Sequence, residues 1–141
     1  MIPLKIKPLV KDLIMPSYAH EGDAGMDVFS HENYTLQPGE RHVFDLGFAT
    51  VLPAGYVALV WDRSSMAVKK GIRNLSGVID SGYRGEWRLI LLNLGNEPVE
   101  IKQGDKIAQI LVQKVERAEI TVVDSLDDSK RGEDWCGSSG G

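Results

Sequence analysis

Short apolar segments, each closed by a glycine or proline turn, follow one another through most of this chain of 141 residues. The large side chains of Val57, Leu59 and Trp61 recur at every second position, which is the period of a strand with one buried face. Turns are marked by Pro38-Gly39 and by Pro53-Ala54-Gly55. Many short strands with frequent turns predict an all-β sandwich or barrel.

The strands expected between these turns account for most of the chain. A first strand begins near Ile2 and ends before Pro16, and the glycine-rich loop 20–25 leads into residues 26–29. Further strands are predicted at residues 34–36, 41–52, 55–61, 72–75, 78–79, 87–94, 99–101, 106–115 and 118–123. The one helix is predicted at residues 62–71, capped by Ser64 or Ser65 and ended by Gly71.

The stretch at residues 77–86 is the strongest candidate for a ligand site. A short apolar run brings the Asp80 carboxylate to a turn that contains Gly82, and Tyr83 follows three residues after the carboxylate. With the apolar run 87–94 behind it, this stretch predicts a hairpin whose turn faces a pocket. One carboxylate, one ring and accessible backbone amides suit a small, polar, planar ligand.

Charge and composition exclude several classes of function. The net charge of −4 argues against a general nucleic-acid-binding surface. No apolar run approaches the roughly 20 residues that span a bilayer, and the first residues lack a signal-peptide core. The single cysteine, Cys136, fits a reducing cytoplasm. After Val123 the composition turns to charge, serine and glycine, so we expect a β domain at residues 1–124 and a flexible tail at residues 125–141.

Five separated motifs carry a resemblance to a known family. They are residues 22–27, residues 63–65, Asn74 with residues 77–86, residues 104–109, and Arg131-Gly132 with residues 137–140. In this order and at this spacing they resemble the trimeric dUTPase family, the deoxyuridine triphosphate nucleotidohydrolases. The resemblance runs from near residue 20 to the end of the chain. It implies a jelly-roll-like β-sandwich or barrel with one short helix and a flexible C-terminal tail.

The resemblance implies an enzyme that hydrolyses dUTP to dUMP and pyrophosphate, which limits uracil in DNA and supplies dUMP for dTMP synthesis. Water would attack the α-phosphorus, with Asp80 as the base that accepts its proton. Mg²⁺ would be the cofactor, held mainly by the substrate phosphates, with Asp27 contacting its water shell. Arg63 would offer a planar fork to phosphate oxygens, and Gln109 would hold the α-phosphate.

The remaining binding residues are implied by the same resemblance. Ser64 and Ser65 would add hydroxyl and backbone N–H groups to the phosphate site. Main-chain groups of Gly77, Val78 and Ile79 would match the edge of uracil, with Asn74 helping, and the slot would have no room for the methyl group of thymine. Tyr83 would lie against the deoxyribose where a 2′-hydroxyl would need space.

The last motif is expected to act as a lid over the phosphates. Arg131 would pair with the γ-phosphate, and Gly137, Ser138 and Ser139 would wrap their amides around the phosphates. The family usually has a phenylalanine where Cys136 stands here, and Trp135 is the candidate replacement for its ring. The family places this tail over a neighbouring subunit, which implies a homotrimer with shared active sites, without nucleic acid or membrane as partners. The expected location is the cytoplasm, or the host cytoplasm or nucleus for a viral protein.

Two other functions stay open on the residues alone. A dCTP deaminase of related fold would release a deaminated nucleotide and would need an acid–base group beside the cytosine amino group. A non-catalytic β-sandwich that binds a nucleotide or a protein would not need both an acidic turn and a phosphate-wrapping tail. Taken singly, Asp80 in a turn and Gln109 in a strand are more often structural than functional. The common order of all five motifs favours the hydrolase.

Overall fold

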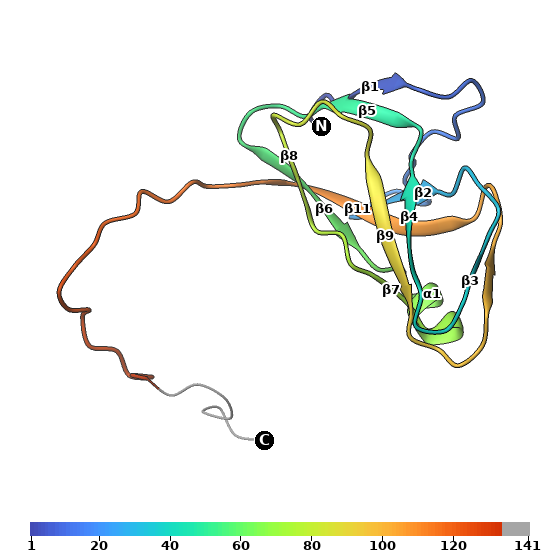
Figure 1. Cartoon of the computed structure of the whole chain (residues 1–141). Coiled ribbons are helices and arrows are strands. Elements are labelled where there is room, and N and C mark those ends of the chain that lie inside the picture. The colour runs from blue at the N-terminus through green and yellow to red at the C-terminus, as the bar shows by residue number, and fades with distance from the viewer. Residues whose placement is uncertain (134–141) are drawn as a thin grey trace.

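Antiparallel strands pair from one end of the folded body to the other in the computed structural model, which describes residues 1–133 (Figure 1). The elements are β1 (Lys5–Pro8), β2 (Met26–Phe29), β3 (Tyr34–Leu36), β4 (Arg41–Asp45), β5 (Phe48–Val51), β6 (Tyr56–Trp61), α1 (Ser64–Lys70), β7 (Ile72–Asn74), β8 (Val78–Asp80), β9 (Arg88–Asn93), β10 (Val99–Ile101) and β11 (Lys106–Lys114). The all-β, jelly-roll-like prediction is confirmed.

Two larger sheets enclose the core. One has the order β2-β11-β6-β8 and the other β4-β9-β7, while β1 pairs with β5 and β3 pairs with β10. Phe44 and Leu89 from the second sheet belong to the same buried apolar cluster as Val60 and Ile110 from the first. Burying a side chain of this size contributes about 1.5–3 kcal/mol, so the cluster holds the two sheets together.

The helix is shorter than predicted and begins without a side-chain cap. Arg63 is the N-cap, with extended backbone, and Ser64 and Ser65 are the first helical residues, so the prediction that a serine caps the helix is wrong. Gly71 ends the helix in the left-handed conformation at φ 66°, as predicted. A Cβ at position 71 would lie 2.9 Å from the backbone nitrogen of Gly95, so only glycine fits there.

The predicted hairpin at residues 78–94 is wrong. β8 pairs with β6, whereas β9 pairs with β4 and β7, so the two strands lie in different sheets. Trp87 explains the change of sheet. The residue is 1% exposed, its backbone N–H donates to the carbonyl of Phe48 at 2.9 Å, and its backbone carbonyl accepts from the N–H of Leu46 at 2.9 Å. These bonds draw the chain away from β6 and across to the second sheet.

Two other strand predictions differ from the structure. The expected strand at residues 41–52 is divided into β4 and β5 by Leu46, which is buried, and Gly47, which has φ 71°. The expected strand at residues 118–123 does not form, because β11 ends at Lys114 and the chain then leaves the body (Figure 1). No helix within residues 1–133 is long and apolar enough to cross a membrane.

Candidate active site

A buried carboxylate joins the first, second and fourth predicted motifs. Asp27 on β2 is 6% exposed, and its Oδ1 is 3.1 Å from Nε of Arg63, the residue before α1. Its Oδ2 is 2.7 Å from Nζ of Lys106 at the start of β11. The carboxylate is buried and both cations are partly exposed, and their shared ion pairs join β2, the start of α1 and β11.

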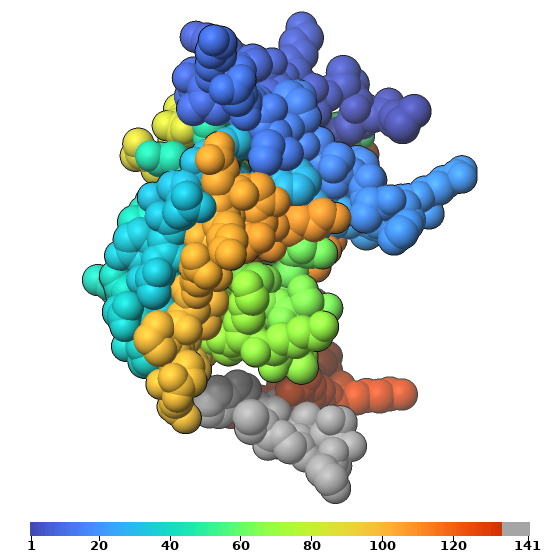
Figure 2. All heavy atoms as spheres, turned by 90° about the vertical axis from the view of Figure 1, so that its right-hand side faces the viewer, coloured from blue at the N-terminus to red at the C-terminus, as the bar shows by residue number. Residues whose placement is uncertain are grey.

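A hollow of about 350 Å³ opens beside this triad. Figure 2 shows helix α1, in green, lying against the orange segment that leads into β11. The side chains and backbone that line the hollow belong to Arg63, Ser65, Met66, Lys69, Lys70, Gly104, Asp105 and Lys106. We call the four cations among them, Arg63, Lys69, Lys70 and Lys106, the cation cluster. The hollow therefore has four positive charges on its wall against the carboxylate of Asp105 and the Asp27 carboxylate that is paired with Arg63 and Lys106. The balance is positive, so the hollow attracts an anion.

Sequence reasoning found Arg63 and Ser65 but missed the three lysines of the cation cluster. Lys106 stands inside the fourth motif, and that position could have drawn attention to it. Lys69 and Lys70 carry no such signal, because basic residues are common in the last turn of a helix. Ser64 is exposed and does not line the hollow.

Gln109 lies next to the triad and is held in one orientation. It stands opposite Asp27 on one side and Trp61 on the other. Its Nε2 donates to the backbone carbonyl of Asp62 at 2.8 Å. Its Oε1 lies where a Cβ of residue 25 would be, so Gly25 is required for this position of the amide.

Asp62, between β6 and α1, also holds the loop formed by residues 74–77, which we call the 74–77 loop. Its Oδ1 accepts from the N–H of Asn74 at 2.5 Å, and its Oδ2 is 3.0 Å from Nε of Arg73. The side chain of Asn74 donates to the carbonyl of Ser76 at 2.9 Å and accepts from the N–H of Ser76 at 3.0 Å. The hydroxyl of Ser76 accepts from the N–H of Ile90 at 2.7 Å, so the loop is braced from three directions.

A hollow of about 230 Å³ lies over this loop. Its lining comes from Leu59, Val60, Trp61, Asp62, Arg73, Asn74, Ser76, Gly77 and Val78. Asn74 therefore lies beside Gly77 and Val78, as the sequence predicted. Its amide, however, is already bonded within the loop, so it shapes the backbone around the hollow. Asp62 was missed, although it directly precedes the second motif.

Asp80 and Tyr83 line a further hollow of about 240 Å³, together with Val78, Ile79, Glu86, Trp87 and Arg88. The Tyr83 hydroxyl donates to the carbonyl of Glu86 at 3.0 Å, and its ring covers Gly85, where a Cβ would collide with it. The hydrogen bond from Arg88 to Asp45 raises the pKa of the Arg88 guanidinium.

The Asp80 carboxylate is exposed at the end of β8, and within residues 1–133 it makes no hydrogen bond or ion pair. Asp80 stands level with Val57 on β6, whereas Gln109 stands level with Trp61 on the other side of the same strand. Val57 and Trp61 are four residues apart, so Asp80 and Gln109 are separated by about 13 Å in the direction of β6. One chain therefore keeps Asp80 apart from Gln109 and from the Asp27–Arg63 pair.

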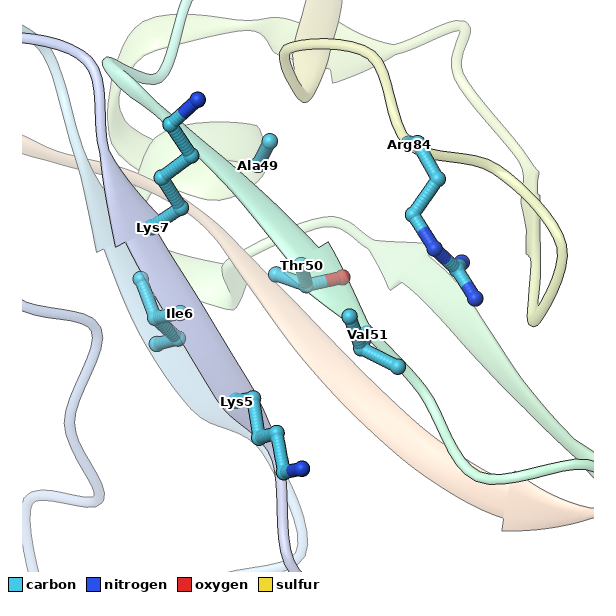
Figure 3. A pocket seen from close by; sticks show the side chains of 7 residues that line it. All are labelled: Lys5, Ile6, Lys7, Ala49, Thr50, Val51 and Arg84. Carbon is cyan, nitrogen blue, oxygen red and sulfur yellow. The ribbon is translucent and has the colours of Figure 1, made fainter.

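Another hollow, of about 310 Å³, lies between β1, β5 and the loop after β8 (Figure 3). Lys5 and Lys7 reach it from β1, and Arg84 extends into it from the loop. The Nη1 of Arg84 donates to the carbonyls of Ser81 at 2.6 Å and Tyr83 at 2.8 Å, so this guanidinium braces the loop. None of the predicted site residues lines this hollow.

The remaining predicted site residues belong to the C-terminal tail. Arg131 is exposed in the described part of the tail, well beyond the end of β11. Trp135, Cys136, Gly137, Ser138 and Ser139 lie outside the described residues.

Known proteins resemble this chain along its whole length. The dUTPase family model matches residues 11–140. The deoxyuridine 5'-triphosphate nucleotidohydrolase of Zymomonas mobilis is 48% identical over 143 aligned residues, which cover 99% of this chain and 98% of that protein. The enzyme of the same name from Thermobifida fusca is 45% identical, with 99% of this chain and 80% of that protein covered.

A solved structure agrees with the sequence relatives. A mutant dUTPase of Staphylococcus bacteriophage 80alpha, determined with dUpNHpp, superposes with a TM-score of 0.91 at 30% identity and with 99% of both chains covered. Another structure, of a mutant dUTPase from the S. aureus phage phi11, is described as revealing a structural Mg(II) ion and has a TM-score of 0.80 at 27% identity, covering 88% of this chain and 98% of that one. Family model, relatives and fold agree over nearly the whole sequence, and this chain belongs to the dUTPase family.

Proposed function

We propose that this protein hydrolyses dUTP to dUMP and pyrophosphate. The observation that carries the proposal is the match of its family model over residues 11–140, joined by relatives that are named for this activity. The product dUMP would serve dTMP synthesis, and removal of dUTP would limit uracil in DNA. The Asp80 carboxylate, exposed and without a partner among residues 1–133, and the separate cation cluster would supply the two chemical functions that the reaction needs.

The cation cluster would bind the triphosphate. A triphosphate carries about four negative charges, which must be balanced before water can approach phosphorus. Arg63 has its Nε on Asp27 and its Nη1 3.5 Å from the carbonyl of Lys106, and the remaining N–H groups of its planar fork would contact phosphate oxygens. Ser64 and Ser65 would add hydroxyl contacts from the first turn of α1, Ser65 from the lining of the hollow and Ser64 from outside it. The Gln109 amide, already oriented by Asp62 and Gly25, would hold the α-phosphate.

The donor set fits a Mg²⁺ ion held mainly by substrate. Within residues 1–133 no group of three or more histidine, cysteine or acidic side chains could hold a metal alone. An ionised carboxylate has about four lone-pair sites, and Asp27 uses two of them on Arg63 and Lys106, which leaves two for metal-bound water. When bound, the ion would neutralise phosphate charge and polarise the α-phosphorus.

Asp80 would act as the general base. Its carboxylate is exposed and bonded to nothing else in the described chain, so it is available to orient a water molecule and accept its proton. Tyr83 would lie against the deoxyribose, held in place by its bond to Glu86. Both side chains line the same hollow, next to Val78 and Ile79.

The base would be read by backbone groups around the 74–77 loop. Gly77, Val78 and Ile79 would present main-chain N–H and C=O groups to the uracil edge. Because Asn74, Ser76 and Asp62 hold this loop by hydrogen bonds, it would not widen to admit the methyl group of thymine.

The active site would be shared between copies in a homotrimer. Water on Asp80 and the amide of Gln109 must meet at one α-phosphate, yet the register of β6 separates them by about 13 Å within a chain. A second copy of the chain can place its Asp80 near the Gln109 of the first. The tail points the same way, since Ile120 and Val122, at alternate positions, are 91% and 93% exposed. Such a segment would gain burial against another chain.

Residues 125–141 would close this shared site as a lid, separate from the β domain at residues 1–124. Arg131 would pair with the γ-phosphate, and Gly137, Ser138 and Ser139 would surround the phosphates with amides. A basic fork on a tail that leaves the body can reach a neighbouring copy. Nucleic acid and membrane are not partners in this proposal.

Mixing two inactive variants tests the shared site. Asp80→Asn and Gln109→Ala chains, each nearly inactive alone, are expected to regain activity when equal amounts are refolded together. With random assembly about a quarter of the sites would combine an intact Asp80 with an intact Gln109 from a neighbour. The measurement is pyrophosphate release per site, with each variant refolded alone as the control. Activity no greater than the sum of the two would show that each chain carries its own complete site.

One assay tests the function itself. Pyrophosphate release is measured from dUTP, dTTP, UTP and dCTP, with Mg²⁺ and after chelation. We expect release from dUTP alone at a useful rate and a large loss after chelation. A deaminated product from dCTP would establish the deaminase alternative, and binding of nucleotide without turnover would establish the non-catalytic module.

A further inference from the structure

We propose that Asp62 is a positioning residue that sets the base selectivity of the enzyme. The proposal rests on the proposed base site at the 74–77 loop. Asp62 lies between β6 and α1, and its carboxylate accepts the N–H of Asn74 at 2.5 Å. A bond to an ionised acceptor is roughly twice as strong as a bond between neutral groups.

Both oxygens of the carboxylate are engaged in holding the loop. Oδ1 is used by Asn74 and Oδ2 by Arg73 at 3.0 Å, and the side chain is 23% exposed. Its contribution is therefore geometric. It fixes where the 74–77 loop begins, and the position of Asn74 then fixes Ser76 through two hydrogen bonds.

Asp62 also contacts Gln109, the residue proposed to hold the α-phosphate, but through its backbone. Its carbonyl accepts from Nε2 of Gln109 at 2.8 Å. Any substitution of the side chain keeps this carbonyl. Changes at Asp62 should therefore act on the base side and leave the phosphate side in place, which gives the role a distinct signature.

Gly25 supplies the matched comparison on the phosphate side. A Cβ at residue 25 would collide with Oε1 of Gln109, which is the end of a flexible side chain and can move aside. Gly25→Ala should displace the amide that holds phosphate and should leave the 74–77 loop unchanged. It should weaken all deoxynucleotides equally.

Three substitutions separate the possible roles of the Asp62 side chain. Asp62→Ala removes both its bonds. Asp62→Asn keeps an oxygen acceptor for Asn74 but loses the charge that pairs with Arg73. Asp62→Glu keeps the charge but moves the acceptor by one methylene, away from the N–H of Asn74. If the position of the 74–77 loop sets base selectivity, Asp62→Asn should keep the selectivity of the natural chain. Asp62→Glu should lose selectivity as Asp62→Ala does.

The experiment compares equilibrium binding of dUpNHpp and its thymine counterpart, together with KM and kcat for dUTP and dTTP. Asp62→Ala and Asp62→Glu are expected to lower the preference for uracil over thymine by roughly tenfold, and Asp62→Asn to keep it within about threefold. Gly25→Ala is expected to weaken both ligands by a similar factor. The binding measurement does not depend on turnover, so it tests Asp62 even if the hydrolytic function were wrong.

Two results would overturn the proposal. A lower melting temperature for Asp62→Ala with unchanged base preference would make Asp62 a purely structural residue. Loss of preference in Asp62→Asn with retention in Asp62→Glu would assign the effect to the ion pair with Arg73. If Asp62→Ala does not fold, the comparison of Asn with Glu decides the question alone.

Discussion

Asp80→Asn is expected to abolish turnover of dUTP while nucleotide still binds. Asparagine keeps the size of the side chain but cannot accept a proton from water, and loss of a general base typically costs 10²–10⁴-fold in rate. Because the Asp80 side chain makes no hydrogen bond or ion pair within residues 1–133, the fold should not depend on its carboxylate. The measurements are pyrophosphate release at saturating dUTP, the affinity for dUpNHpp, and the melting temperature.

Glu100→Gln is the matched control for this change. It removes one negative charge from an exposed carboxylate that pairs with Lys102 at 3.6 Å, a surface contact worth about 0–1 kcal/mol. Its kinetics should equal those of the natural chain. Full pyrophosphate release by Asp80→Asn would show that another group activates the water.

The strands that the sequence predicted best have a local cause. β9 and β11 place apolar residues against the core at alternating or nearly alternating positions, so their periodicity is visible without knowing their neighbours. β6 was found as a strand, but its predicted face was wrong: Ala58 and Val60 belong to the core cluster, whereas Trp61 is 55% exposed. The hairpin at residues 78–94 was wrong because strand pairing is not local. The bonds of Trp87 to Leu46 and Phe48 join segments about forty residues apart, and no pattern within residues 78–94 encodes them.

In the candidate site, too, the residues were predicted from local motifs, whereas their spatial arrangement depends on strand pairing. Asp27, Arg63, Asp80 and Gln109 were all found as members of ordered motifs. The separation of Asp80 from Gln109 follows from strand register, and a motif scan cannot supply that. The role of Lys106 depends on the pairing of β11 with β2, which has a register shift between Lys106 and Ala108. In this pairing the Lys106 ammonium contacts Asp27.

The segment at residues 118–123 shows what a single chain cannot satisfy. Its alternating apolar residues predict a strand, and the side chains of Ile120 and Val122 remain more than nine-tenths exposed. A strand forms only when its backbone groups and its apolar face find a partner. The prediction was wrong for one chain, and the proposed trimer would provide the missing surface.

Deleting residues 125–141 is expected to remove most activity and leave the folded body intact. The strands and the helix of the described structure lie between Lys5 and Lys114, so the deletion removes none of them. The loss would come from Arg131 and the glycine-serine run, which would no longer contact the phosphates or exclude water. Removing a donor that stabilises transition-state charge costs about 10²–10³-fold, and the deletion removes several.

The deletion begins after Asp124, so the exposed pair Ile120 and Val122 stays in the chain and assembly can be measured separately from closure. We expect the truncated protein to elute at the same oligomeric size and to melt at the same temperature as the full chain. Arg131→Lys in the full chain keeps the charge but loses the planar fork, and it should give a smaller loss than the deletion. Unchanged kcat/KM in the truncated protein would remove the lid from the mechanism, whereas a change in oligomeric size would assign the tail to assembly instead.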